Sequence, residues 1–334
     1  MNVNEAEIQV LAQLYGAQSD AEPTDRDSLE RRGEKYWIYR EDWSPAFSSL
    51  VGKKLIEGSD QGYRLTDLGR PPAQVYFEER PSLYWYYYQR FYGAAHGSDA
   101  HTRFCERVYG LDLCQEGMTD MASIRRLLDR LELQPGQRLL DLGCGAGGIS
   151  AYISDQTGTH VTGVDYSALA VSVAMERTDS KRSMMTFLEA DLNTLDLPPR
   201  SFDAAISIDS IYWVSNVLNS IERIISTLKP GGQFAILVVQ LLEYCDRPDE
   251  MEIDNTPVAR ALETLGLDYQ AFDETENFRE FWPRVKSAAS DLQDDFTRDG
   301  NGFICEQLMR EADAEFLPAL KANELRRYLY QVRV

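Results

Sequence analysis

The chain has 334 residues, of which 43% are hydrophobic and 26% charged, so it can form one large or two modest domains with a real core. Its formal net charge of −20 argues against nucleic acid and anionic membranes as partners, because both repel a polyanion. No run of about 18 apolar residues predicts a membrane span, and the N-terminus lacks a signal-peptide pattern, so we expect a cytoplasmic protein.

The cysteines and histidines follow no pattern of a disulfide framework or a metal site. The five cysteines are scattered and never stand in C-x-x-C spacing, and the three histidines are isolated from one another. These residues are Cys105, Cys114, Cys144, Cys245, Cys305, His96, His101 and His160. We therefore expect no bound metal.

Residues 1–75 predict small helices followed by a β-hairpin. The hairpin consists of a strand at Lys54–Glu57, a Gly/Ser/Asp turn and a strand at Tyr63–Thr66. This order resembles the end of a winged helix, a fold that often binds DNA. Residues 1–70 contain nine Lys or Arg against thirteen Asp or Glu, however, and a DNA-binding surface needs the opposite balance. We therefore predict a winged-helix-like dimerisation or docking domain, and a homodimer that binds no nucleic acid.

Residues 76–118 form a connector that is unusually rich in aromatic side chains. They surround the axis of one predicted helix, so they cannot all face a single core. The aromatic residues are Tyr84, Trp85, Tyr86, Tyr87, Tyr88, Phe91 and Tyr92. They suit either interdomain or dimer packing, or the cover of a small-molecule pocket. On the second interpretation Tyr88 is a candidate substrate contact.

From residue 119 to 334 the pattern alternates between buried strands and amphipathic helices. The strands are expected within residues 136–143, 160–167, 185–192, 202–209, 233–239, 269–272 and 326–334. Strands and helices that alternate at these lengths predict a mostly parallel sheet with helices on both faces, a Rossmann-like α/β architecture. We expect the last strand to be antiparallel. Residues 241–300 exceed a plain connection and are expected to contain a substrate lid.

The loop after the first strand of this region carries Gly143, Gly145 and Gly148 in G-x-G-x-x-G spacing, which is typical of nucleotide-binding folds. The glycines alone leave NAD(P), FAD and S-adenosylmethionine as candidates. Asp141 precedes the loop, and no Lys or Arg occurs between Arg138 and Arg177. A carboxylate without nearby cations repels a pyrophosphate but attracts an ammonium. The loop therefore favours S-adenosylmethionine, which has an ammonium and a sulfonium but no phosphate.

Two further acids follow the next two strands. Asp165 ends "VTGVD", where a carboxylate accepts hydrogen bonds from ribose hydroxyls. Asp191 ends "FLEAD", where a carboxylate can accept from an adenine amino group, with Leu192 beside it.

Together "LLDLGCGAGG", "VTGVDYS", "EADLNTLDLPPRSFDAAISIDSIYWV" and "LKPGGQFAIL" resemble the class I S-adenosylmethionine-dependent methyltransferases over residues 119–240. The resemblance implies a seven-stranded sheet with one antiparallel strand. It also implies that Asp141, Gly143 and Gly145 contact the methionine part of the donor, Asp165 the ribose, and Asp191 and Leu192 the adenine. We add Tyr166 and Asp209 to the candidate donor contacts.

The acceptor side is less defined by the sequence. Methyl transfer needs alignment and exclusion of water, and a base only if the nucleophile must lose a proton. His101 is the first candidate for such a base and His96 the second. Asp209 suits a base, an anchor for a cationic substrate, or a cap of the following helix. The candidate contacts to the acceptor are Tyr88, Tyr212, Trp213, Gln240 and Tyr244.

The sequence thus predicts a small-molecule methyltransferase that uses S-adenosylmethionine and acts on an oxygen, nitrogen, sulfur or carbon nucleophile. Two alternatives stay open. One is a winged-helix transcriptional regulator that senses S-adenosylmethionine, and the other is an NAD-dependent oxidoreductase.

Overall fold

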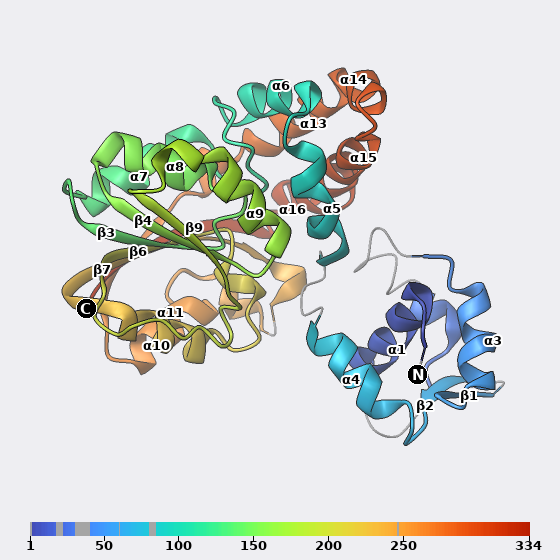
Figure 1. The fold of residues 1–334 in the computed structure, drawn as a ribbon. Helices are drawn as coiled ribbons and strands as arrows, with labels where there is room; N and C mark the ends of the chain where they lie inside the picture. Colours follow the sequence, from blue (N-terminus) through green and yellow to red (C-terminus); the bar gives the residue numbers. More distant parts are fainter. Residues whose placement is uncertain (1, 18–22, 31–40, 60, 80–84, 246) are drawn as a thin grey trace. The chain divides into compact units, whose positions relative to one another are not determined.

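The computed structural model describes residues 2–17, 23–30, 41–59, 61–79, 85–245 and 247–334. The chain divides into two compact units, Met1–Arg90 and Phe91–Val334 (Figure 1). The division falls within the predicted connector, beyond the boundary at residue 75. Tyr84 lies outside the described residues. None of the described helices is long and apolar enough to cross a bilayer.

The described part of the first unit contains helices around a small core and one hairpin. Its elements are α1 (Glu5–Ala17), α3 (Ser44–Gly52), β1 (Ile56–Ser59), β2 (Gly62–Leu65) and α4 (Arg70–Glu79). Leu11, Leu14 and Phe47 are fully buried there and hold α1 against α3. The hairpin begins later than predicted, because Lys54 takes a left-handed conformation (φ 60°) at the end of α3. The assignment as a winged helix stays a prediction.

The second unit contains a seven-stranded sheet in the order β5-β4-β3-β6-β7-β9-β8 (Figure 1). The strands are β3 (Arg138–Leu142), β4 (His160–Asp165), β5 (Met185–Glu189), β6 (Phe202–Ile208), β7 (Leu228–Leu241), β8 (Asp268–Asp273) and β9 (Leu325–Arg333). β9 runs antiparallel to both of its neighbours, and the adjacent pairs from β5 to β7 are parallel. The predicted α/β sheet with its antiparallel last strand is confirmed.

Helices cover both faces of this sheet (Figure 1). They are α7 (Met121–Leu131), α8 (Gly148–Thr157) and α9 (Ala168–Arg177) on one face, and α10 (Val217–Thr227) and α11 (Pro257–Thr264) on the other. Leu127 of α7 and Ile153 of α8 belong to one buried cluster. Ile221 of α10 and Leu262 of α11 belong to a second. Both faces of the strands are therefore apolar, as the near-continuous hydrophobic runs of the sequence predict.

Further helices form a lobe beside the sheet (Figure 1). They are α5 (Trp85–Ala95, from Phe91 on in this unit), α6 (Asp99–Val108), α12 (Thr275–Phe278), α13 (Phe281–Asp291), α14 (Gln293–Arg298), α15 (Gly302–Glu311) and α16 (Leu317–Ala322), with a π-helical turn at Ala312–Phe316. Short 3-10 turns occupy Asp179–Lys181, Ile211–Trp213, Leu242–Tyr244 and Pro248–Met251.

The lobe does not coincide with the predicted lid at residues 241–300. Within that range α11 packs on α10 against the sheet, whereas α13 and α14 pack against α6. Ser98 at the start of α6 donates a 2.9 Å hydrogen bond from Oγ to Asp299, and Arg103 forms a 2.7 Å ion pair with Asp295. Of the predicted range, only the part from α12 onward belongs to the lobe, which extends to Ala322. The function of a lid stays a prediction.

Candidate functional site

The chain order places a ligand site at the C-terminal ends of β3 and β6. From β3 the chain proceeds to β4 and β5 on one side, then returns to β6 and β7 on the other. Ligands of open α/β sheets bind where the strand order reverses in this way. The glycine loop lies between β3 and α8 at this point, and Asp209 directly follows the neighbouring strand β6.

Asp141 and Asp165 are buried carboxylates that hold the glycine loop. Ser150 donates a 2.5 Å hydrogen bond to Asp141 Oδ2, and the backbone N–H groups of Gly145 and Ser167 each donate to Asp165 at 2.9 Å. Burial raises the pKa of each carboxyl to about 6. When ionised, Asp141 gives the loop the negative charge that the sequence predicted for a cationic ligand.

A segment ahead of the sheet lies against this loop, and we call residues 113–119 the cover segment. The carbonyl oxygen of Leu113 lies only 1.8 Å from where a Cβ on Gly148 would stand, so only glycine fits there. Tyr92 approaches Gly145 (φ 52°) less closely, with its hydroxyl 3.0 Å from the corresponding Cβ position. The cover segment and Tyr92 therefore both lie against the loop.

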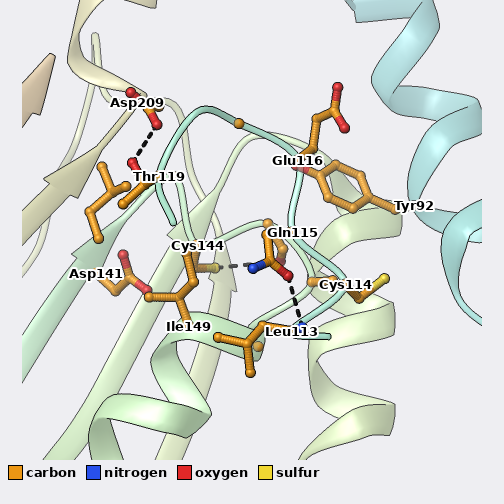
Figure 2. Close-up of a pocket in the computed structure, with 16 residues that line it drawn as sticks. Tyr92, Leu113, Cys114, Gln115, Glu116, Thr119, Asp141, Cys144, Ile149 and Asp209 are labelled. Carbon is orange, nitrogen blue, oxygen red and sulfur yellow. Dashed lines mark hydrogen bonds between the residues drawn. The ribbon is translucent and has the colours of Figure 1, made fainter. Parts of the chain in front are cut away.

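A pocket lies between these parts (Figure 2). Its lining is Tyr92, Leu113, Cys114, Gln115, Glu116, Gly117, Thr119, Asp141, Gly143, Cys144, Gly145, Ala146, Gly148, Ile149, Ile208 and Asp209. Figure 2 shows Tyr92 and Glu116 on one side and Asp209, hydrogen-bonded to Thr119, on the other. The lining includes Asp141, Gly143, Gly145 and Asp209 of the predicted donor contacts, with Asp165 bound to the Gly145 amide.

S-adenosylmethionine suits the chemistry of this pocket. The lining includes no Lys, Arg or His that would hold a pyrophosphate, and it includes three carboxylates. The glycine loop leaves backbone N–H groups at the start of α8 for a carboxylate, and buried Asp141 supplies the charge that an ammonium needs.

The structure shows a partner of Asp209 that the sequence analysis did not include. Arg327 on β9 forms a buried ion pair with Asp209, and the same carboxylate accepts 2.9 Å and 2.7 Å hydrogen bonds from Met118 N and Thr119 Oγ1. Its side chain is therefore not the cap of the following helices, whose N-cap residues are Ser210 and Asn216. Its roles as a base and as an anchor for a cationic substrate stay predictions.

Neither candidate histidine lines the pocket. His101 is buried on α6 against the rings of Phe91 and Phe104, and burial lowers its pKa to about 4. His96 lies beside Glu176, with Nε2 3.8 Å from the carboxylate. The expected base roles of both residues therefore lack the contact with the pocket that general-base catalysis requires.

A group of potential metal ligands surrounds His101 as well. Its ring, Cys105 and Asp112 each bring one potential ligand atom to within 4.8 Å of the others. The Cys105 sulfur, however, is 3.6 Å from Nδ1 and 3.7 Å from Nε2. The expectation that the protein binds no metal stays a prediction.

The other predicted donor contacts do not line the pocket. Asp191 accepts 2.8 Å hydrogen bonds from the backbone and side chain of Asn193, which makes a turn after β5. Leu192 packs against the core beneath α10. Tyr166 follows Asp165 at the end of β4 and is half-buried. Their contacts to adenine or ribose stay predictions.

The predicted acceptor contacts are also outside the pocket lining. Tyr212 packs on the core, and the centre of its ring lies 5.2 Å from the centre of the Trp213 ring. Gln240 donates to Cys245 at 3.1 Å, and the exposed Tyr244 donates to Glu315 at 3.0 Å. Tyr88 belongs to the first unit, where its ring contacts Tyr87. These roles stay predictions too.

Several residues of the site had no role assigned from the sequence, among them Tyr92, Gln115 and Arg327. Tyr92 stood among many aromatic residues, and its i+4 spacing from Tyr88 does not reveal which of them faces the glycine loop. Gln115 lines the pocket and accepts a 2.8 Å hydrogen bond from Leu113 N, which shapes the cover segment. Arg327 lies in the last strand, far along the chain from the glycine loop. For Gln115 a signal existed, namely its place in "LCQEGMTD", shortly before the helix that begins at Met121.

The fold and the glycine site define a class I S-adenosylmethionine-dependent methyltransferase domain. Residues 140–236 match the family described as "Methyltransferase domain", so the chain carries such a domain. Among curated proteins it is similar to phosphoethanolamine N-methyltransferase 1 of Zea mays, with 32% identity over 143 residues, 43% of this chain and 27% of that protein. The phosphoethanolamine N-methyltransferase of Triticum aestivum is 28% identical over 209 residues, 58% of this chain and 40% of that one.

Solved structures share the fold. Phosphoethanolamine N-methyltransferase 2 of Haemonchus contortus, in complex with phosphomonomethylethanolamine and S-adenosylhomocysteine, has a TM-score of 0.53 at 20% identity, over 74% of this chain and 60% of that one. The cyclopropane synthase MmaA2 of Mycobacterium tuberculosis has a TM-score of 0.58 at 15% identity, over 74% and 98%. The matched part of the chain spans less than half the length of the Zea mays and Triticum aestivum proteins. These comparisons give no support to either alternative function, a transcriptional regulator or an NAD-dependent oxidoreductase.

Proposed function

We propose that the protein transfers a methyl group from S-adenosylmethionine to the nitrogen of a small amine that carries no phosphate. The observation that carries this proposal is the charge of the pocket. Its lining includes Glu116, Asp141 and Asp209 but no Lys, Arg or His, and the cation beside it, Arg327, is paired with Asp209. A phosphorylated acceptor needs a cationic partner, whereas an amine is attracted by carboxylates.

Tyrosines near the pocket support the same sign of charge. Burial raises the pKa of the Tyr109 hydroxyl well above its ordinary value, and the charges of Glu116, Glu311 and Asp209 add to this. Tyr212 shows the same direction, with burial as the main cause. Carboxylates that destabilise a tyrosinate anion stabilise a bound ammonium, so they favour a cationic acceptor over an anionic one.

The residues around the pocket mainly position and enclose the reactants. The donor supplies a methyl group on a positively charged sulfur, and displacement requires the attacking nitrogen in line with that bond. The nitrogen needs its lone pair, so an acceptor ammonium first releases a proton to a carboxylate or to water. The cover segment, Tyr92 and the glycine loop exclude water and fix the geometry, which is the main demand of this reaction.

The test is S-adenosylhomocysteine release with matched acceptors that differ only in a phosphate. Ethanolamine with phosphoethanolamine, and their N-methylated forms, provide such pairs. The proposal predicts that the unphosphorylated member of a pair has at least a tenfold higher kcat/KM. A preference for the phosphorylated member contradicts the proposed substrate class, and release only with phenols contradicts the proposed nitrogen acceptor.

We also propose that the first unit mediates a homodimer and that the protein acts in the cytoplasm without binding nucleic acid. The acidic balance of residues 1–70 supports docking to protein over DNA. All five cysteines are free thiols, which suits a reducing compartment. Light scattering on the full chain should give twice the mass of 38.0 kDa, and a mass of one chain contradicts the dimer.

A further inference from the structure

Arg327 joins the sheet to the cover segment through a buried network of hydrogen bonds. Its guanidinium is almost fully buried and forms an ion pair with Asp209. One nitrogen of the same group, Nη2, donates to Asp209 Oδ2 at 3.1 Å and to Thr119 Oγ1 at 2.6 Å. Phe278 covers the guanidinium, with its ring centre 5.2 Å away. The side chain is thus fixed on several sides and directed at the end of the cover segment.

The carboxylate of Asp209 completes the attachment. Besides Arg327 it accepts from Met118 N and Thr119 Oγ1, so two consecutive residues of the cover segment are bonded to one charged pair. Asp209 adopts a left-handed backbone conformation (φ 54°), which is unusual for a residue with a Cβ. A strained backbone persists where the surrounding contacts fix it, and here those contacts include the cover segment, Arg327 and the Leu237 carbonyl, which accepts a 3.0 Å hydrogen bond from Asp209 N.

A buried ion pair is not an efficient way to stabilise a sheet. Desolvation of both charges offsets most of their attraction, and an apolar pair of similar size often serves as well. An apolar pair, however, offers neither the acceptor for Met118 N nor the donor and acceptor for Thr119. The pair therefore does something that simple packing cannot do, which is to fix the position of the cover segment relative to β6 and β9.

We propose that Arg327 is a positioning residue for donor binding, acting through Asp209 and Thr119. The network holds the C-terminal end of the cover segment, while the Leu113 carbonyl closes on Gly148 at the other end. With both ends fixed, the segment is preorganised over the glycine loop, and the donor binds without the cost of ordering it. This inference rests on the donor of the proposed function but not on its acceptor.

Thr119→Val is the sharpest test, because it keeps the shape of the side chain and leaves the Asp209–Arg327 pair intact. We expect the Kd and KM for S-adenosylmethionine to rise about tenfold, since hydrogen bonds to charged groups are lost, with kcat changed less than the KM. Amide hydrogen exchange of residues 113–119 should become faster, while the unfolding midpoint changes little. Thr275→Val is the matched control: Thr275 accepts a 3.0 Å hydrogen bond from Arg327 N, outside the cover segment.

Arg327→Lys and Arg327→Met form a second series, in which lysine should restore part of the donor affinity that methionine loses. If the Met variant does not fold, Thr119→Val alone decides. Unchanged donor affinity and unchanged exchange of residues 113–119 in Thr119→Val overturn the proposal, as does an equal loss of affinity in Thr275→Val. Hydrogen exchange of residues 113–119 is measured without donor. If the wild type binds no S-adenosylmethionine, the proposed function is refuted, but the exchange data still show whether Arg327, Asp209 and Thr119 hold the cover segment in place.

Discussion

Replacing Gly148 by alanine tests how closely the cover segment fits the glycine loop. The added Cβ would stand 1.8 Å from the carbonyl oxygen of Leu113, whereas ordinary contact begins at 3.4 Å. The two backbones must therefore separate by about 1.6 Å, the difference between these distances. Because a misplacement of about 1 Å can cost about 100-fold in rate, we expect kcat/KM for S-adenosylmethionine to fall at least about 100-fold. Overpacking should also lower the free energy of unfolding by about 1–3 kcal/mol.

The assay is donor-dependent S-adenosylhomocysteine release, together with calorimetric donor titration and urea unfolding. Gly302→Ala is the matched control, since Gly302 also begins a helix and its added Cβ would be in ordinary contact with Thr297, with Oγ1 at 3.6 Å and Cα at 3.9 Å. It should keep donor affinity and gain up to about 1 kcal/mol from helix propensity. If Gly148→Ala binds the donor as tightly as Gly302→Ala, the cover segment does not close on the loop and our account of the pocket is wrong.

Further predictions concern three variants. The pKa values of Asp141 and Asp165 are both about 6, so both carboxyls become neutral below that pH, and calorimetry should show the Kd for S-adenosylmethionine rising as the pH falls, by up to about tenfold per pH unit for each carboxylate. Asp141→Asn should lose the part of this dependence that belongs to Asp141 and keep the part that belongs to Asp165. Tyr92→Phe should raise the KM for the donor several-fold in steady-state assays, because the hydroxyl beside Gly145 is removed, and an unchanged KM would exclude a role in donor binding. The pKa of His101 is lowered from 6.5 to about 4, so its neutral form contributes stability that is complete above pH 6.5 and is lost as the pH falls through 4. Compared with His101→Leu, wild type should therefore lose about 2 kcal/mol of unfolding free energy between pH 7 and 5 in urea titrations, and the variant should retain turnover.

The sheet was predictable because its signals are local. Residues such as Leu140, Ile206 and Ile236 stand in short apolar runs, and strands buried on both faces need such runs. The alternating segment at the end of the chain likewise predicted the antiparallel β9. β7 begins at Leu228, before the predicted residue 233, because "LKPGG" extends the strand and carries no hydrophobic signal of its own.

The site was predictable where it depends on the residues that immediately follow a strand, and not where it depends on contacts between distant segments. Asp141 and Asp165 fall beside the glycine loop, because parallel strands end at one edge. The partner of Asp209 is Arg327, which is far away in the sequence, and no local pattern pairs the two. For His101, the sequence predicts a helix but not which of its faces meets the pocket, and packing places the ring against Phe91 and Phe104.

Calorimetric titration of the full chain with S-adenosylmethionine and, separately, with NAD distinguishes a methyl-donor site from a dinucleotide site. We expect binding of S-adenosylmethionine at one site per chain, abolished or strongly weakened by Gly148→Ala, and no measurable heat with NAD. Tight binding of NAD without binding of S-adenosylmethionine would contradict this expectation, because a pocket with carboxylates and no cations would then hold a pyrophosphate.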